Sequence, residues 1–327
     1  MFQYCLYKID EKPYCCWELD VKKRNIEFLN KIDWEYFIFQ SELFGKELDG
    51  ENKQKAALAI RNIYHHAMET FFLLVCSTLQ APYCVYAWMF HAKTGDIRNV
   101  IRKLTKSDNS LFTNFRLEEK DWQSLSSMIH FINVSAEYKI PNQKELAKQF
   151  TRLWSSLSER FLDDYSIKEY NAIKHGLRTS IGGFTVNIGP KGTLNVPERH
   201  NEWRSLGSSE FGSSFYVIEQ LINASIKDNP NYQSTRYHLN WNPKLLVDVI
   251  KLIAISINNF VNFLKFINGV EPEKTPYFIP ETDELFNNYW EYTHSLSQMK
   301  FDIDIKPEQI QPFGSQEIIS FFEKQNQ

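Results

Sequence analysis

The chain has 327 residues, of which 43% are hydrophobic and 15% aromatic. This composition excludes an intrinsically disordered protein, because so many large side chains must be buried. Its formal net charge of −3 excludes a global basic field, so any contact with nucleic acid requires a local patch. Since single hydrophobic cores stop growing at roughly 250–300 residues, the length allows one large domain or two joined ones.

The amino terminus and the cysteines favour a cytoplasmic protein. Residues 1–10 contain polar residues and no small-residue cleavage site, so we expect no signal peptide. The longest strongly apolar run, 71–76, is much shorter than the ~18–20 residues that cross a bilayer, and we expect no membrane contact. Five cysteines without a C-x-x-C pair favour reduced thiols. The alternative is a zinc site built from Cys5, Cys15 and Cys16 with a distant histidine.

The first half of the chain is predicted to form helices after an irregular segment over residues 1–30. Apolar residues at spacings of three and four predict a long helix over 51–80 with one buried face, ended by Pro82. A second apolar stretch follows at 83–91. Further helices are predicted at residues 33–45, 97–104, 117–132, 142–162 and 166–178.

A β-hairpin is predicted within residues 181–204. Apolar and polar residues alternate at 184–188 and again at 194–196, on either side of a Gly-Pro-Lys-Gly turn. A polar stretch rich in Gly and Ser follows at 205–214.

The last third is predicted to be helical again. Asn242 followed by Pro243 is typical of a helix start, and Gly269 is typical of a helix end. Two shorter helices are predicted near 283–297 and 315–324. The buried face of the long helix is expected to contain Leu246, Val249, Ile250, Ile253, Ile257, Phe260, Leu264 and Ile267.

These patterns predict a mainly α fold, a helical bundle with one small β-hairpin. The expected parts are an irregular segment at 1–30, a helical core at 31–180, the hairpin at 181–204 and a C-terminal helical region at 205–327.

Residues 170–176, Tyr-Asn-Ala-Ile-Lys-His-Gly, form the most informative segment. Asn171 and His175 are four residues apart and share one helix face. The basic residues Lys168, Lys174 and Arg178 surround the pair, and the end of a helix favours a protonated imidazole. This group can therefore bind phosphate. In the alternative interpretation, Asn171 and His175 only cap the last carbonyls of the helix.

The same segment resembles the final-helix motif of the HEPN superfamily, which consists of all-helical bacterial and archaeal domains. Many members are metal-independent ribonucleases of toxin and phage-defence systems, in which Arg, a polar residue and His meet across a dimer. The resemblance covers roughly residues 50–180 and places the polar position on Asn171 and the His on His175. Tyr170 stands where those ribonucleases have Arg. The resemblance implies a homodimer that cleaves or binds RNA or nucleotides in bacterial defence or stress, without a cofactor.

A second segment, 61–66, has the sequence Arg-Asn-Ile-Tyr-His-His and also fits Arg, Asn, three residues and His. Arg61, His65 and Glu69 are spaced by four and are predicted to line the polar side of the 51–80 helix. If that helix faces 166–178, His65 or His66 approaches His175, and such a group can cleave RNA through its 2′-hydroxyl. In the alternative interpretation, Glu69 pairs with His65 and Arg61 is solvated.

Other chemistry is not expected. His65, His66, Glu69 and His91 lack the His-Glu-x-x-His order, so no metal site is predicted. No P-loop, dinucleotide fingerprint or Gly-x-Ser-x-Gly elbow occurs.

Two functions from different classes remain. The first is a HEPN-like RNA- or nucleotide-directed factor, in its catalytic form a metal-independent endoribonuclease. The second is a non-catalytic interaction or sensor module that dimerises. In the first, the catalytic candidates are His175, Asn171, Arg61 and His66, and the phosphate-binding candidates are Lys168, Lys174, Arg178 and His65.

Overall fold

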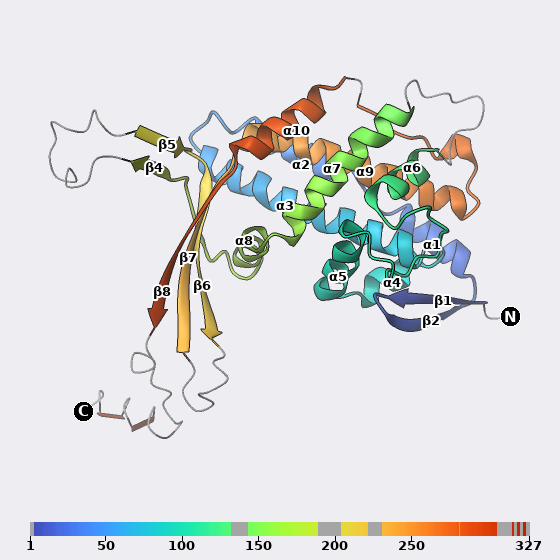
Figure 1. The fold of residues 1–327 in the computed structure, drawn as a ribbon, viewed down its shortest axis with the longest axis horizontal. Helices are drawn as coiled ribbons and strands as arrows, with labels where there is room; N and C mark the ends of the chain where they lie inside the picture. Colours follow the sequence, from blue (N-terminus) through green and yellow to red (C-terminus); the bar gives the residue numbers. More distant parts are fainter. Residues whose placement is uncertain are drawn as a thin grey trace.

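The computed structural model describes residues 3–131, 143–188, 204–221, 231–280 and 282–305, together with 316, 319–320 and 323–324. The helices form one body, and a sheet extends from one end of it (Figure 1). The elements of the first half are β1 (Gln3–Ile9), β2 (Lys12–Glu18), α1 (Val21–Leu29), α2 (Glu35–Gly45), α3 (Lys53–Gln80), α4 (Val85–His91), α5 (Thr94–Thr105) and α6 (Trp122–Phe131). The later elements are α7 (Gln143–Leu162), α8 (Asp164–Lys174), β3 (Thr179–Ile181), β4 (Thr185–Ile188), β5 (Arg204–Ser208), β6 (Gly212–Leu221), β7 (Asn231–Asn240), α9 (Pro243–Ile267), the 3-10 turn η2 (Pro272–Lys274), α10 (Glu284–Ser295) and β8 (Ser297–Ile305).

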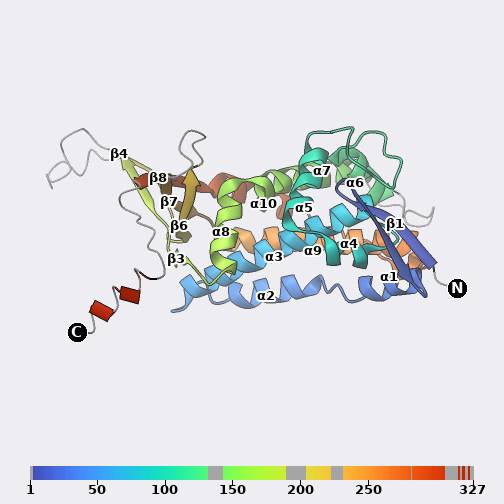
Figure 2. The ribbon, with the colours of Figure 1, turned by 90° about the horizontal axis from the view of Figure 1, so that it is seen from below.

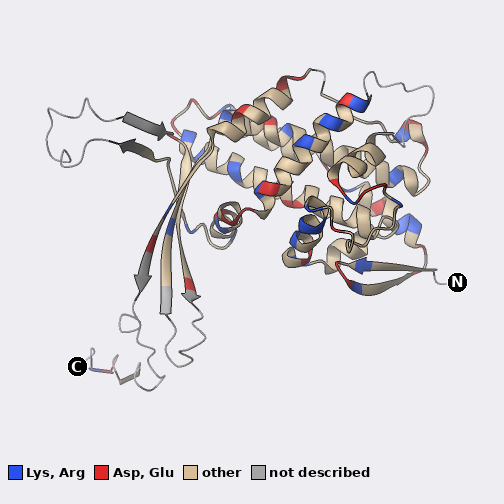
Figure 3. Ribbon diagram, in the orientation of Figure 1, with Lys and Arg blue, Asp and Glu red and all other residues tan. Residues whose placement is uncertain are grey.

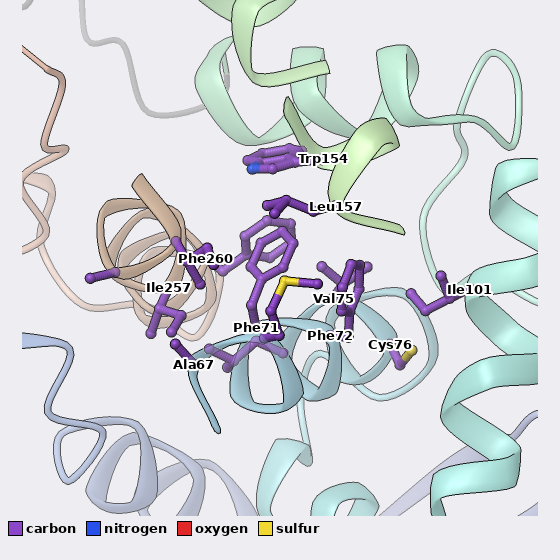
Figure 4. Close-up of a cluster of buried hydrophobic side chains, with 14 of the residues drawn as sticks. Ala67, Phe71, Phe72, Val75, Cys76, Ile101, Trp154, Leu157, Ile257 and Phe260 are labelled. Atoms are coloured by element: carbon purple, nitrogen blue, oxygen red, sulfur yellow. The ribbon is translucent and has the colours of Figure 1, made fainter. Parts of the chain in front are cut away.

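The core lies where α3, α7 and α9 meet (Figure 4). Phe71 of α3 contacts the ring of Trp154 of α7 at 5.9 Å and that of Phe260 of α9 at 5.7 Å. Trp154 and Phe260 are 5.0 Å apart, so three fully buried aromatic rings fix the spacing of these helices. Because α9 joins this same core, the C-terminal helices do not form a separate hydrophobic centre.

The boundaries of α9 agree with the prediction. The Asn242 side chain accepts hydrogen bonds from the backbone N–H groups of Lys244 and Leu245, and Pro243 occupies the first turn. Gly269 adopts a φ of 86°, which ends the helix. By length and composition α9 could cross a membrane, but 72% of its most apolar window is buried in the fold.

The sheet that leaves the helical body is antiparallel, in the order β3-β6-β7-β8. Phe215 and Tyr237 stack at 5.3 Å on its inner face, which is packed against α8. Its outer face exposes Tyr216, Ile218 and Phe301. Figure 2 shows this sheet and the hairpin β4-β5 on the same side of the helices.

The mainly α class is correct, but the prediction of one small hairpin is wrong, because the described residues contain additional strands. The region 205–327 was expected to be helical, yet it contains β5 to β8. β7 was missed because most of its residues are polar, and Ser, Thr and Asn are typical of loops. Its buried residues Thr235, Tyr237 and Leu239 still alternate as a half-buried strand requires.

The predicted hairpin at 181–204 is correct in its first strand. β4 pairs with β5, with Ile188 opposite Arg204. The second strand predicted at 194–196 lies outside the described residues. The helix predicted at 315–324 falls on residues of which only five are described.

The amino-terminal segment 1–30 is not irregular, as predicted, but forms the hairpin β1-β2 and then α1. Tyr7 and Ile9 are buried, and Asp10 adopts a left-handed φ of 53° in the tight turn. The Trp88 indole N–H donates a hydrogen bond to the Lys8 carbonyl at 2.9 Å, which attaches the hairpin to α4.

We predict that Ile253→Ala lowers the free energy of unfolding by about 2–5 kcal/mol, because Ile253 is fully buried and its truncation leaves a cavity. Urea titration measures this loss. Lys244→Ala on the same helix serves as the control, because its ion pair with Asp49 is exposed and contributes only ~0–1 kcal/mol. A loss below ~0.5 kcal/mol for Ile253→Ala would place that face of α9 on the surface.

We also predict an acid-sensitive core at His130. Its ring lies 4.6 Å from that of Phe150, and burial lowers its pKa to about 4. Between about pH 6.5 and pH 4 the unfolded chain therefore binds a proton that the folded chain does not. Above about pH 6.5 the neutral His130 costs no stability. As the pH falls from about 6.5 to about 4, the free energy of unfolding decreases by roughly 3 kcal/mol.

The measurement is the free energy of unfolding by urea at several pH values for the wild type and for His130→Phe. The variant keeps an aromatic ring but cannot titrate, so its stability should fall less steeply with acid. Parallel curves for the two proteins would contradict the assignment to His130.

Candidate functional site

The meeting point of α3 and α8 is built around a buried carboxylate, that of Glu169. Its Oε2 atom accepts hydrogen bonds from Arg61 Nε at 2.9 Å and Arg61 Nη2 at 2.6 Å. The same oxygen accepts a third hydrogen bond, from His65 Nε2, at 3.1 Å. Glu169 is 0% exposed and Arg61 is 2% exposed, so this ion pair is shielded from water.

The sheet and α10 complete this buried network. Glu169 Oε1 accepts hydrogen bonds from Ser213 Oγ at 2.6 Å and from Trp241 Nε1 at 3.2 Å. Arg61 Nη1 donates to the Tyr292 hydroxyl at 2.7 Å. The network therefore joins α3 and α8 to β6, to the residue after β7 and to α10.

The electrostatics favour a charged pair with a neutral histidine. Burial alone raises the pKa of Glu169, but Arg61 and His65 together hold it well below its usual range. Burial opposes the charge on Arg61, yet Glu169 keeps the pKa of the guanidinium above its ordinary value. Burial and the nearby charge of Arg61 keep the pKa of His65 below its ordinary value, although Glu169 raises it. His65 is therefore neutral and donates its Nε2 hydrogen, which is a structural role.

The predicted polar side of α3 is thus wrong for Arg61 and His65. Both were expected to face solvent or a substrate, but α8 covers them. The alternative pairing of His65 with Glu69 is wrong as well, because Glu169 takes that place. Glu69 instead accepts a hydrogen bond from the Tyr170 hydroxyl at 2.8 Å and lies 3.7 Å from Lys174 Nζ.

An open groove of about 630 Å³ runs along the outer side of the same two helices. Asn62 and His66 of α3 are exposed here, one residue after Arg61 and His65 respectively. The ring of His66 is in edge-to-face contact with Phe37 of α2, at 5.3 Å. The polar side chains that line the groove belong to Lys55, Asn62, His66, Glu69, Tyr170 and Lys174.

The end of α8 borders this groove and presents the other predicted residues. His175 is the C-cap, and its backbone N–H donates to the Asn171 carbonyl at 3.1 Å. The helix ends at Lys174 rather than at 178, because Gly176 adopts a φ of 97°. Asn171, His175 and Arg178 are exposed, and their side chains form no hydrogen bond or ion pair with the rest of the described chain. The last carbonyls of α8, those of Ala172 and Ile173, accept hydrogen bonds from the backbone N–H groups of Arg178 and Leu177, so the imidazole of His175 does not cap the helix.

Lys168 does not belong to this exposed group. Its ammonium donates to the Tyr237 hydroxyl at 2.7 Å and pairs with Glu219 at 2.9 Å. Burial alone would lower the pKa of Lys168, but these two partners raise it. Lys168, predicted to bind phosphate beside His175, therefore has its ammonium directed to the sheet and does not line the groove.

Figure 3 shows Lys and Arg interspersed with Asp and Glu over the helices, so any binding of an anion depends on local groups. Within the described residues, no group of three or more His, Cys, Asp or Glu side chains is arranged to hold a metal ion. His91, one of the weighed metal candidates, lies against Tyr14 of the amino-terminal hairpin at a ring distance of 5.7 Å.

Comparison of the chain with protein-family models, with curated proteins and with solved structures gives no match.

The sequence reasoning missed Glu169, Ser213, Trp241 and Tyr292. One signal for Glu169 was available, because it precedes the buried Ala172 and Ile173 by three and four residues and so shares their face. A carboxylate on a buried face needs a cationic partner, and Arg61 is a fitting one.

We predict that Glu169→Gln lowers the free energy of unfolding by about 3–5 kcal/mol, because it leaves the buried Arg61 guanidinium without a counter-charge. Chemical denaturation at neutral pH measures the loss. Glu69→Gln is the matched control, since Glu69 is partly exposed and its pairing is worth at most ~1 kcal/mol. Equal losses in the two variants would show that the buried Arg61–Glu169 pair stabilises the fold no more than an exposed pair does.

Proposed function

We propose that this chain is a HEPN-like homodimer that binds RNA or nucleotide phosphates in the groove between α3 and α8. The observation that carries the proposal is the exposure of His66 and Lys174 in one groove, next to the exposed His175. The resemblance of residues 170–176 to the HEPN motif supports the same position, and it implies a role in bacterial defence or stress.

The charges along the groove support an anionic ligand. Lys55 and Lys174 both line it, and Arg178 lies just beyond the end of α8. Glu69 also lines the groove, but it already accepts a hydrogen bond from Tyr170. Ammonium and guanidinium groups form charge-assisted hydrogen bonds with phosphate oxygens that are stronger than neutral ones.

An exposed apolar stripe on α2 supports dimerisation. Tyr36, Phe39 and Leu43 lie on one face of this helix, and all three are exposed. Phe37 of the same helix touches His66, so the stripe is next to the groove. A second copy that covers α2 would also enclose the groove from one side, which suits a site shared between two chains.

A catalytic form of this function uses His66 and His175. One neutral imidazole takes the proton of an RNA 2′-hydroxyl, the 2′-oxygen attacks phosphorus, and the bond from phosphorus to the 5′-oxygen breaks. The other imidazole, protonated, gives its proton to that leaving oxygen. Lys174 stabilises the charge on the phosphorane in place of Arg61, which is held by Glu169.

The second candidate, a non-catalytic interaction or sensor module, is favoured by one observation. Arg61 and His65, two of the residues that a nuclease would use, are withdrawn into the buried network with Glu169. In that case the groove binds its partner but does not catalyse a reaction.

We predict that Lys174→Ala weakens binding of single-stranded RNA about 10-fold, since a hydrogen bond to a charged group contributes about 1.5–3 kcal/mol. Fluorescence anisotropy at two salt concentrations measures the affinity and its salt dependence. Lys148→Ala, an exposed lysine of α7, is the control and should bind as the wild type does.

His66→Ala and His175→Ala separate the two candidates. If the groove is catalytic, both variants lose RNA cleavage and keep the melting temperature of the wild type, because both side chains are exposed. A wild type that binds RNA without cleaving it favours the non-catalytic module. A wild type that neither binds nor cleaves RNA or nucleotides contradicts the proposal.

A further inference from the structure

A second, smaller cavity lies among α3, α5, α7 and α8. It shares Tyr170 with the α3–α8 groove, but its other walls are its own. Its volume is about 30 Å³, whereas the groove measures about 630 Å³. A space of this size admits water or a small inorganic ion and excludes a nucleoside.

The cavity is lined by two guanidinium groups, those of Arg98 on α5 and Arg160 on α7. Among the described residues that line it, none is an aspartate or a glutamate. His65 also lines the cavity, and its ring is neutral for the reasons given above. The walls therefore carry two positive charges and no negative charge.

Both arginines have hydrogen-bond donors to spare at this place. The Nε atoms of Arg98 and Arg160 are buried, and neither has a hydrogen-bond partner in the part of the chain that the structure describes. Arg160 Nη2 donates to the Thr293 carbonyl at 3.5 Å, which is a long and weak contact. A buried donor without a partner costs free energy, and the cost is larger for a charged group.

The surrounding side chains do not neutralise these charges. Burial lowers the pKa of Arg98, and the carboxylates of Glu69 and Asp164 offset this effect only in part. Neither carboxylate forms an ion pair with Arg98, and Glu69 already accepts the hydrogen bond from Tyr170. The Ser166 hydroxyl, which also lines the cavity, donates to Asp163 at 3.1 Å. A compensating negative charge must therefore come from outside the described chain.

We propose that Arg98 and Arg160 bind a small inorganic oxyanion, of the size and charge of inorganic phosphate, in this cavity. Guanidinium groups offer donors in a planar fork that matches phosphate oxygens, and two of them facing one cavity provide a doubly charged site. The site goes beyond the proposed RNA or nucleotide groove, because it has its own cationic residues and a different ligand.

A bound oxyanion would connect three helices. Arg98 belongs to α5 and Arg160 to α7, while Ser166 and Tyr170 of α8 complete the wall. Because the folded chain binds the anion and the unfolded chain lacks the site, phosphate should stabilise the protein in proportion to its occupancy.

The test titrates inorganic phosphate into the full-length protein by isothermal titration calorimetry, in phosphate-free buffer with sodium chloride fixing the ionic strength. The wild type should bind one phosphate per chain. Its melting temperature should rise with phosphate and not with sodium chloride at the same ionic strength. Arg98→Gln and Arg160→Gln should each weaken binding about 10-fold or more, because each removes a charged donor.

Two variants serve as controls. Arg102→Gln removes an exposed arginine of the same helix, whose Nη1 donates to Asn99 at 2.8 Å, and should bind phosphate as the wild type does. Lys174→Ala, which lies in the groove and outside the cavity, should also keep phosphate binding. Adenosine monophosphate should not displace phosphate, because the cavity excludes a nucleoside.

The melting temperature without phosphate gives a second readout. Arg98→Gln removes a buried charge that has no counter-ion in the described chain, so in phosphate-free buffer it should melt at or above the temperature of the wild type. In phosphate the order should reverse. Arg98→Gln alone therefore tests the site even if Arg160→Gln does not fold.

Three results overturn the proposal: a wild type that phosphate neither binds nor stabilises, phosphate binding that survives Arg98→Gln, or phosphate binding that is lost in Lys174→Ala. The last result would place the anion in the α3–α8 groove. RNA binding is measured separately, so failure of either proposal can be recognised without the other.

Discussion

The structure depends on one buried charge pair, Arg61 with Glu169. A carboxylate removed from water must be matched by a cation and by hydrogen-bond donors, and Glu169 accepts five hydrogen bonds from four side chains. Two of the donors, Ser213 and Trp241, lie where the sheet joins the helices. The orientation of the sheet on the helical body is therefore tied to the same oxygen atoms that neutralise Arg61. An apolar contact at this position would allow the sheet to shift along the helices. Directional hydrogen bonds instead select one orientation of the sheet.

Near this pair, one face of α3 is buried against α8 and the adjacent face is exposed in the groove. Successive residues of a helix are turned by about 100° from each other, so Arg61 and His65 can be buried while Asn62 and His66 face the groove. Segment 61–66, which fits the Arg, Asn, three residues and His pattern, therefore has some residues buried and others exposed. Its arginine is buried with Glu169, and its final histidine, His66, is exposed in the groove. The groove is lined by the imidazole of His66 and the ammonium groups of Lys55 and Lys174, whereas the guanidinium of Arg61 is buried with Glu169.

The features that could be predicted from the sequence are those that depend on residues close together in the chain. The limits of α9 follow from Asn242, Pro243 and Gly269, and the buried face of that helix follows from its 3.6-residue period. The burial of Arg61 could not be predicted, because a charged residue on a helix is usually solvated and its partners come from distant parts of the chain. Strands β6 to β8 were missed for a related reason, since polar residues such as Ser, Gln and Asp interrupt their sequences and are typical of loops. The groove between α3 and α8 likewise depends on the packing of two helices that are distant in the sequence.

The order in which the partners of Arg61 occur along the chain has a consequence for synthesis on the ribosome. Glu169 follows Arg61 by 108 residues and Tyr292 follows it by 231. During translation, α3 is therefore made long before its counter-charge, and the guanidinium must remain hydrated until α8 has emerged. The network is complete only after α10, near the end of the chain, has been added. The amino-terminal half consequently cannot reach its final packing alone, and a nascent chain arrested before α10 presents an incompletely enclosed arginine to the surrounding solvent.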